Sequence, residues 1–206
     1  MAFVAEMEFR TLSKRLSEKL GVEAPTIAEP EVQQAAIEAP AAVAFDASKY
    51  ETIRDAVALQ AWIDRIYARG YVAVDTETTS LNEMRADLVG VSLCVEAGEA
   101  AYLPLTHRAG QSDDLFGTDA LAEGQMDHDT ALAMLKPMLE DSTILKIGQN
   151  MKYDAKILAR VGIQLAPIDD TMLMSYAQNG GLHNHGMDLL SARYLDHAPI
   201  SIKTLL

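Results

Sequence analysis

From residue 71 the chain reads Tyr71-Val-Ala-Val-Asp-Thr-Glu-Thr-Thr-Ser-Leu81, an apolar run that ends in two carboxylates. The run 71–75 predicts a β-strand buried on both faces, as central strands of α/β sheets are. Side chains two residues apart on a strand project to the same side, so Asp75 and Glu77 can converge on one point. Carboxylate pairs of this kind commonly bind hard divalent cations. The alternative is a strand that runs into a turn with two solvated acids.

Composition bounds the possible functions. The length of 206 residues allows one good-sized domain with additional material, and 49% hydrophobic residues can supply a core. The formal charge of -13 argues against a general electrostatic attraction for nucleic acid, which needs clustered Lys and Arg. It does not exclude a nucleic-acid enzyme, because bound metals and local basic groups can offset acids at a site.

Cysteine usage and hydropathy bear on the compartment. The single cysteine, Cys94, lies in an apolar run and is expected to be a small core residue. One cysteine cannot form an internal disulfide, so we expect a cytoplasmic protein. No apolar run approaches the roughly 20 residues that a membrane-spanning helix needs. The N-terminus carries acids and no sustained apolar core, so it does not resemble a signal peptide.

The N-terminal part differs in composition from the rest. Apolar residues spaced by three or four predict a helix from Phe3 to about Leu20. The following residues are rich in Ala, Glu and Pro and predict a flexible linker. We therefore expect a junction helix over 1–22, a linker over 23–46 and a domain over 47–206. The helix would belong to an upstream part of a larger protein, or be a tethered peripheral helix.

The remainder alternates between strand and helix patterns. Strands are predicted at 50–53, 71–75, 88–95, 101–105 and 143–147. Helices are predicted at 55–69, 129–140 with a kink or restart at Pro137, 150–161, 170–178 and 188–195, and a loop at 107–128. Three strands followed by alternating helix and strand predict an α/β layered domain.

A second polar cluster, Asn150-Met-Lys-Tyr-Asp154, follows the predicted strand 143–147. Sites in α/β sheets usually form at the carboxyl ends of strands, so Asp154 can approach Asp75 and Glu77. Like charges so close raise each other's pKa unless a cation neutralises them, and three converging acids therefore indicate a metal site. Taken alone, Asp154 could simply be an acid favoured near a helix N-terminus.

These residues resemble a known family. The segment from Asp75 to Leu81 resembles the first exonuclease motif of the proofreading domain of the bacterial DNA polymerase I (family A) enzymes, and 150–154 resembles the second. Asp170-Thr-Met-Leu and the segment 187–195 resemble the helices that follow. The resemblance covers about 50–206. Residues 7–16 are similar to the segment that joins the 5′-nuclease part of these enzymes to the proofreading part.

The resemblance implies a ribonuclease-H-like α/β fold of the DnaQ type. Its mixed sheet has three antiparallel strands in a meander, then parallel strands, and is flanked by helices. It implies two divalent ions, Mg²⁺ or Mn²⁺, held by four acids that include Asp75, Glu77 and Asp154. The implied activity is hydrolysis at the single-stranded 3′ end of DNA, with a polymerase domain in the same parent chain as partner.

The resemblance also implies substrate contacts. Leu81 would wedge against the terminal base, and Asn150 and Tyr153 would contact the strand near the scissile phosphate. Thr78 is assigned to substrate binding on the same basis. From the residues alone, Leu81 could instead be a core residue beside a turn, and Tyr153 a packed helix tyrosine.

One part of the family pattern is missing. The fourth acid belongs to a Tyr-x-x-x-Asp motif, which does not occur in the C-terminal part of this sequence. His183-Asn-His-Gly-Met-Asp188 fits the His-x-x-x-x-Asp pattern of histidine-type relatives, but we interpret Asp188 as an N-cap or first-turn acid. His183 and His185 could in principle bind a transition metal.

Without the fourth acid we expect weak or no turnover by a fragment of the parent polymerase. Two alternatives remain open at this point. One is a free-standing RNA-trimming nuclease of the same superfamily. The other is a catalytically silent domain that only braces its neighbours, against which the presence of Asp75, Glu77 and Asp154 argues.

Overall fold

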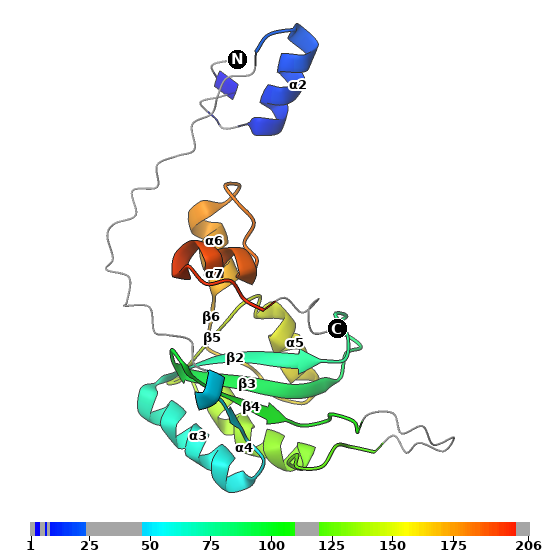
Figure 1. Ribbon diagram of the computed structural model, residues 1–206, viewed down its shortest axis with the longest axis vertical. Helices are drawn as coiled ribbons and strands as arrows, with labels where there is room; N and C mark the ends of the chain where they lie inside the picture. Colours follow the sequence, from blue (N-terminus) through cyan, green and yellow to red (C-terminus); the bar gives the residue numbers. More distant parts are fainter. Residues whose placement is uncertain (1–2, 5–6, 8, 24–46, 110–119, 201–206) are drawn as a thin grey trace. The chain divides into compact units, whose positions relative to one another are not determined.

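The computed structural model describes residues 3–4, 7, 9–23, 47–109 and 120–200, so the predicted linker lies almost wholly outside the described residues. The chain divides into two compact units, 1–41 and 42–206. In the first unit, α2 spans Arg10–Leu20 (Figure 1) and ends at Gly21, which has a left-handed φ of 63°. Phe3 and Val4 are helical as predicted, but the predicted helix is interrupted at Phe9, which has a non-helical backbone (φ -75°, ψ 70°).

Within the described residues of the second unit, six strands form one mixed sheet in the order β1-β4-β3-β2-β5-β6. The strand β2 pairs antiparallel with β3, and β3 pairs antiparallel with β4. The strands β5 and β6 continue the sheet in parallel, and β1 lies parallel to β4 at the opposite edge. This is the predicted mixed topology. The strand bounds are β1 Glu51–Thr52, β2 Tyr71–Thr78, β3 Leu88–Glu96, β4 Glu99–Pro104, β5 Leu145–Gly148 and β6 Ile168–Asp170.

The helices follow the predicted pattern with shifted ends. They are the short 3-10 helix η1 Ala47–Lys49, α3 Ala56–Arg69, α4 His128–Glu140, α5 Lys152–Arg160, α6 Thr171–Asn179 and α7 Met187–Leu195. A restart of α4 at Pro137 does not occur: the helix is one element with the proline in its last turn, where few backbone bonds remain to be lost. The strand β6 was not predicted.

The helix α3 shows how local sequence sets an element. The Asp55 side chain accepts the backbone N–H of Ala58 and caps the first turn, and Gly70 ends the helix with a φ of 80°. Its buried side chains are Leu59, Trp62, Ile63 and Ile66, which share the 3.6-residue period. Each such side chain contributes about 1.5–3 kcal/mol by leaving water.

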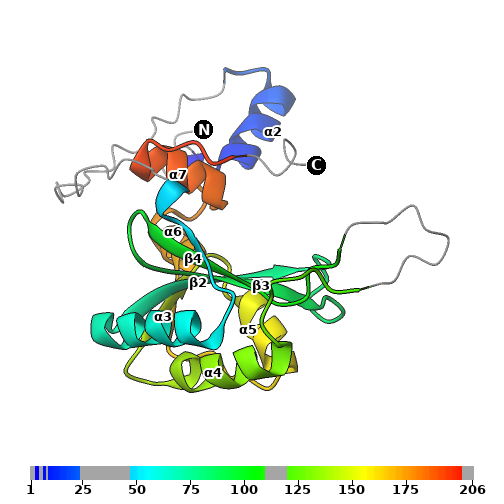
Figure 2. The ribbon, with the colours of Figure 1, turned by 60° about the horizontal axis from the view of Figure 1, so that its bottom comes forward.

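The two faces of the sheet differ. Figure 2 shows α3, α4 and α5 together on one side of the sheet. On β2 the side chains of Val72, Val74 and Thr76 are buried toward these helices, whereas Asp75 and Glu77 are exposed on the other face. The prediction that strand 71–75 is buried on both faces is therefore wrong, because on the other face Tyr71 and Ala73 are only partly buried and Asp75 is exposed. The open face is defined here as the side of the sheet that carries Asp75 and Glu77.

The helices in the described part of the chain are all too short or too polar to cross a membrane.

Candidate active site

Two acids stand side by side on the open face. The strand β2 runs to Thr78, three residues beyond the predicted end, and pairs with β3 as far as that residue. Glu77 is thus held in the strand, not in a turn. The burial pattern alternates, so Asp75 and Glu77 project to the same side, as predicted. Both carboxylates are exposed near the carboxyl end of the strand.

The third acid, Asp154, reaches β2 from α5. Its carboxylate Oδ1 accepts the backbone N–H of Thr76 at 3.0 Å and the Thr76 hydroxyl at 2.6 Å, and the residue is 2% exposed. The strand β5 pairs with β2 only up to Ala73, so it leaves the Thr76 N–H on that edge without a strand partner. A buried N–H needs an acceptor, and Asp154 supplies it.

Electrostatics couple the three acids. Loss of hydration beside neighbouring protein atoms raises the pKa of Asp75 to about 6, helped by the charges of Asp154 and Glu77 and opposed by a backbone hydrogen bond from Thr76. Burial also raises the pKa of Asp154, and the charge of Asp170 adds to the rise while the Thr76 hydrogen bonds oppose it. Both carboxyl groups therefore resist ionisation, and a nearby cation would relieve this.

The donor chemistry suits a hard divalent ion, because three carboxylates supply only oxygen ligands. Through the described ranges, however, no group of three or more His, Cys, Asp or Glu side chains is arranged so that it could hold a metal ion. The assignment of Asp75, Glu77 and Asp154 as metal ligands stays a prediction. Their chemistry fits such an ion, but their side chains are not gathered around one point.

Tyr153 joins the two motifs. Its hydroxyl lies within hydrogen-bonding distance of the Thr78 hydroxyl and of the Ser80 carbonyl, and Thr78 Oγ1 is 3.1 Å from Ser80 O, so the two hydroxyls share this carbonyl as an acceptor. The ring packs partly against the core. Tyr153 is therefore a packed tyrosine that also fixes the segment after β2. Its predicted substrate contact and that of Thr78 remain predictions.

Leu81 lies beyond this anchored segment and is 94% exposed. The interpretation of Leu81 as a core residue beside a turn is wrong. Exposure of a large apolar side chain next to a candidate site leaves it available to a ligand.

Asn150 precedes α5 with a left-handed φ of 60°, which shortens the predicted helix at its start. Asparagine tolerates this conformation better than most residues. The Asn150 N–H donates to Asp170 Oδ1 at 3.1 Å and the Met151 N–H donates to Oδ2 at 2.9 Å. Asp170 also accepts the N–H groups of Met172 and Leu173, at 2.9 and 3.3 Å, and so caps α6.

Asp170 was missed as a site residue by the sequence analysis. It is 5% exposed, and its carboxylate ties the second motif to the start of α6. An Asp directly before a helical segment is an N-cap signal that could have drawn attention to it. Thr76, which holds Asp154, carries no such signal.

The second candidate set lies around α7. Asp188 is an exposed acid in the first turn of α7, and Gly186 is the N-cap, so the first-turn interpretation holds. The rings of His183 and His185 lie 5.0 Å apart. His185 Nδ1 bonds to the Ser175 hydroxyl at 2.8 Å. None of these residues belongs to a metal-holding group within the described residues.

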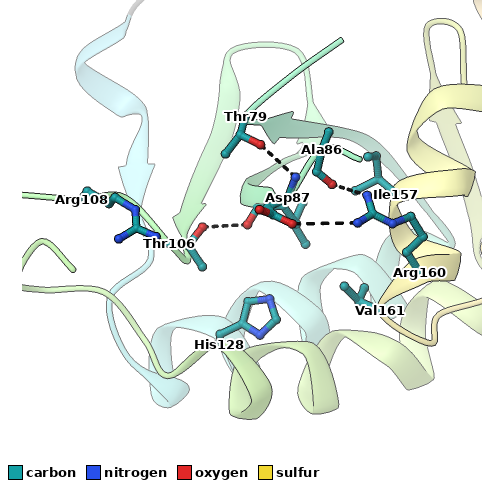
Figure 3. Close-up of a pocket in the computed structure, with 10 residues that line it drawn as sticks. Thr79, Ala86, Asp87, Thr106, Arg108, His128, Ile157, Arg160 and Val161 are labelled. Carbon is teal, nitrogen blue, oxygen red and sulfur yellow. Dashed lines mark hydrogen bonds and ion pairs between the residues drawn. The ribbon is translucent and has the colours of Figure 1, made fainter. Parts of the chain in front are cut away.

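A cavity of about 340 Å³ opens elsewhere in the second unit (Figure 3). Its walls come from the segment after β2, the start of β3, the start of α4 and the end of α5. Several of its polar groups are paired with each other: Thr79 Oγ1 accepts the Asp87 N–H at 2.9 Å, and Arg160 donates to the Ala86 carbonyl. Asp75, Glu77 and Asp154 do not line it.

Comparison with protein families places these features in context. A family described as a 3′–5′ exonuclease matches residues 50–205. The DNA polymerase I of Rhizobium leguminosarum is 46% identical over 182 residues, covering 84% of this chain and 18% of that protein. The DNA polymerase I of Pseudomonas aeruginosa is 38% identical over 159 residues, covering 76% of this chain and 16% of that protein. The chain thus spans about a sixth of the length of these curated relatives.

Solved structures share the fold. Escherichia coli RNase D superposes with a TM-score of 0.54 at 19% identity, over 76% of this chain and 36% of that one. Brucella melitensis NrnC with bound Mg²⁺ superposes with a TM-score of 0.51 at 24% identity, over 74% of this chain and 64% of that one. With the sheet order β1-β4-β3-β2-β5-β6, these matches confirm the predicted ribonuclease-H-like fold.

Proposed function

The chain belongs to the 3′–5′ exonuclease family of DNA polymerase I, and from this we propose that residues 47–206 form a proofreading domain acting on single-stranded 3′ ends of DNA. The observation that carries the proposal is the presence of three acids near the carboxyl end of one strand, β2. Asp75 and Glu77 share the open face, and the charges of Glu77 and of Asp154 help raise the pKa of Asp75. In the parent protein, residues 1–22 and the linker 23–46 would connect this domain to an upstream part.

The three acids would hold two divalent ions, Mg²⁺ or Mn²⁺. When bound, such ions lower the pKa of the attacking water and stabilise the departing 3′ oxygen. Asp154 is already fixed by Thr76, so it supplies a rigid ligand, whereas Glu77 is exposed and adjustable. Glu77 would also help to place the attacking water, and Asp75 would be a ligand of the ions.

The remaining predicted residues would hold the DNA strand. Tyr153 and Thr78 fix each other and the Ser80 carbonyl, which gives the segment before Leu81 a defined position. Leu81 would then stand against the terminal base. Asn150, whose backbone N–H is bonded to Asp170, would contact the DNA strand near the scissile phosphate.

In the parent protein, the polymerase domain would be the functional partner, and the reaction would serve DNA replication and repair. The 206 residues hold three of the four acids that the family resemblance implies, so we expect this chain to turn over slowly.

The proposal is tested with a 3′-labelled single-stranded DNA and an RNA of the same sequence, each with Mn²⁺, under single-turnover conditions. We expect release of 3′ mononucleotides from DNA, abolished in Asp75→Ala and Glu77→Ala. Asp64 is an exposed acid on α3, so Asp64→Ala is the matched control and should behave as wild type. Cleavage of RNA alone would favour the RNA-trimming alternative, and fast cleavage lost in Asp188→Ala would favour the histidine-type pattern.

A further inference from the structure

A tyrosine shares the open face with the two exposed acids. In the sheet register, Asp75 is paired with Ser92 on β3, and Ser92 is paired with Tyr102 on β4. Residues directly opposite each other in antiparallel strands point to the same side. Tyr102 therefore projects from the same face as Asp75 and Glu77, two strands away.

The Tyr102 ring does not stay over its own strand. It lies against Gly90 on β3, where a Cβ would come within 2.7 Å of Tyr102 Cε2 and still closer to Cζ and the hydroxyl oxygen. Gly90 is the residue paired with Glu77. The Tyr102 hydroxyl thus occupies the place of the side chain that would stand opposite Glu77. Such opposite Cβ positions are about 5 Å apart, within reach of a glutamate carboxylate.

His107 fixes the hydroxyl from the other side. The Tyr102 hydroxyl and His107 Nε2 are 2.6 Å apart, and the rings meet edge to face with centroids at 5.6 Å. The His107 backbone is held in turn by Gln125. The His107 N–H donates to Gln125 Oε1 at 2.7 Å, and Gln125 Nε2 donates to the His107 carbonyl at 2.9 Å. The ring position is therefore determined by the fold.

We propose that Tyr102, anchored by His107, is a positioning residue that orients the Glu77 carboxylate on the open face. A tyrosine hydroxyl has one donor hydrogen and can accept two hydrogen bonds. In the tautomer in which His107 Nε2 carries the hydrogen and donates it to Tyr102, the hydroxyl hydrogen is available to Glu77. Glu77 is exposed on the strand and would otherwise sample several rotamers, so a fixed donor lowers the entropy lost when the carboxylate engages a ligand.

Two further observations fit this role. Burial raises the pKa of Tyr102, and the negative charge of Glu77 raises it further. Because the ring needs the space over position 90, a residue with a side chain there would displace it from Glu77. Filling a core gap would not require the hydroxyl, whereas orienting a carboxylate does.

The test uses the full chain and rests on the proposed function for its metal readout. Mn²⁺ affinity is measured by calorimetry in Tyr102→Phe and in Gly90→Ala. Each should weaken Mn²⁺ binding about three- to tenfold, which is the factor expected from losing one orienting hydrogen bond. Tyr71→Phe is the matched control, because Tyr71 lies on the same face and its hydroxyl bonds to Arg69 at 2.8 Å. It should leave Mn²⁺ affinity unchanged.

A double-mutant cycle separates positioning from general packing. In a Glu77→Gln background, Tyr102→Phe should have no further effect on Mn²⁺ affinity. An equal loss in both backgrounds, or wild-type affinity in Tyr102→Phe, would overturn the proposal. If wild type binds no Mn²⁺, the proposed function fails. The coupling between Tyr102 and Glu77 is then tested by measuring the unfolding midpoints of the same four proteins in EDTA. Non-additive shifts support the coupling, and additive shifts refute it.

Discussion

At the scale of single residues, Asp75 lies in an environment that disfavours its charge. Its pKa is raised from 3.8 to about 6, so between these values the folded chain keeps a proton that the unfolded chain has released. The stability that this protonation provides is present at low pH and is lost as the pH rises from 3.8 to about 6. An acid held in this way lowers the stability of the folded chain at neutral pH.

We therefore predict that Asp75→Asn stabilises the metal-free protein at pH 7.5. The gain should be about 1 kcal/mol, less than the full pKa shift implies because solvent screens an exposed group. At pH 4 the gain should vanish, since Asp75 is then largely protonated in the folded wild type. Urea unfolding in EDTA at both pH values measures this, with Asp64→Asn as control. Equal gains at both pH values would contradict the assignment.

Leu81 gives a second prediction at this scale. Because its side chain is 94% exposed, Leu81→Ala should change the free energy of unfolding by less than about 0.5 kcal/mol. The affinity of Leu81→Ala for a single-stranded 3′ end should nevertheless fall, by about 1 kcal/mol, because the leucine would bury apolar surface against the terminal base. Fluorescence anisotropy with 3′-end and internal-loop DNA checks this. A loss of stability, or unchanged 3′-end binding, would show that Leu81 has no wedge role.

At the scale of elements, the site depends on where strands and helices stop. The position of Asp75 and Glu77 could be predicted from sequence, because the two-residue period of a strand is a local property. The bond between Asp154 and Thr76 could not, since it joins residues 78 positions apart and arises only because β5 pairs no further than Ala73. The strand β6 could not be predicted because it has only three residues, too few to show a two-residue period. The need for glycine at position 90 could not be predicted either, because it depends on where the Tyr102 ring lies.

The Asp170 carboxylate holds α5 and α6 together and gives the prediction for this scale. Asp170→Ala would leave four backbone N–H groups near a buried position without their acceptor. We expect a loss of about 3 kcal/mol or more in unfolding free energy. Asp55→Ala is the control, because Asp55 is an exposed cap that accepts the Ala58 N–H at 2.8 Å. It should cost about 1 kcal/mol. Equal losses in the two variants would show that Asp170 is an ordinary cap.

At the scale of the whole molecule, the formal charge of -13 sets how DNA can be held. With few cationic contacts to phosphates, binding of single-stranded DNA in EDTA should be weak. Its dependence on NaCl should be shallow, with a slope in log-log units of about -2 or less in magnitude, since each phosphate contact adds about -0.7. Divalent ions should then strengthen binding. A slope steeper than about -5 would indicate an extended basic surface that this account lacks.

The central claim is that Asp75 and Glu77, on the open face, act together with Asp154 as a divalent-ion site near the carboxyl end of β2. A calorimetric titration of Mn²⁺ into the full chain at pH 7.5 tests it most directly, with Asp75→Ala and Asp64→Ala in parallel. We predict saturable binding by wild type and Asp64→Ala, and its loss in Asp75→Ala. Binding by Asp75→Ala with wild-type affinity, or no binding by wild type, would contradict the account.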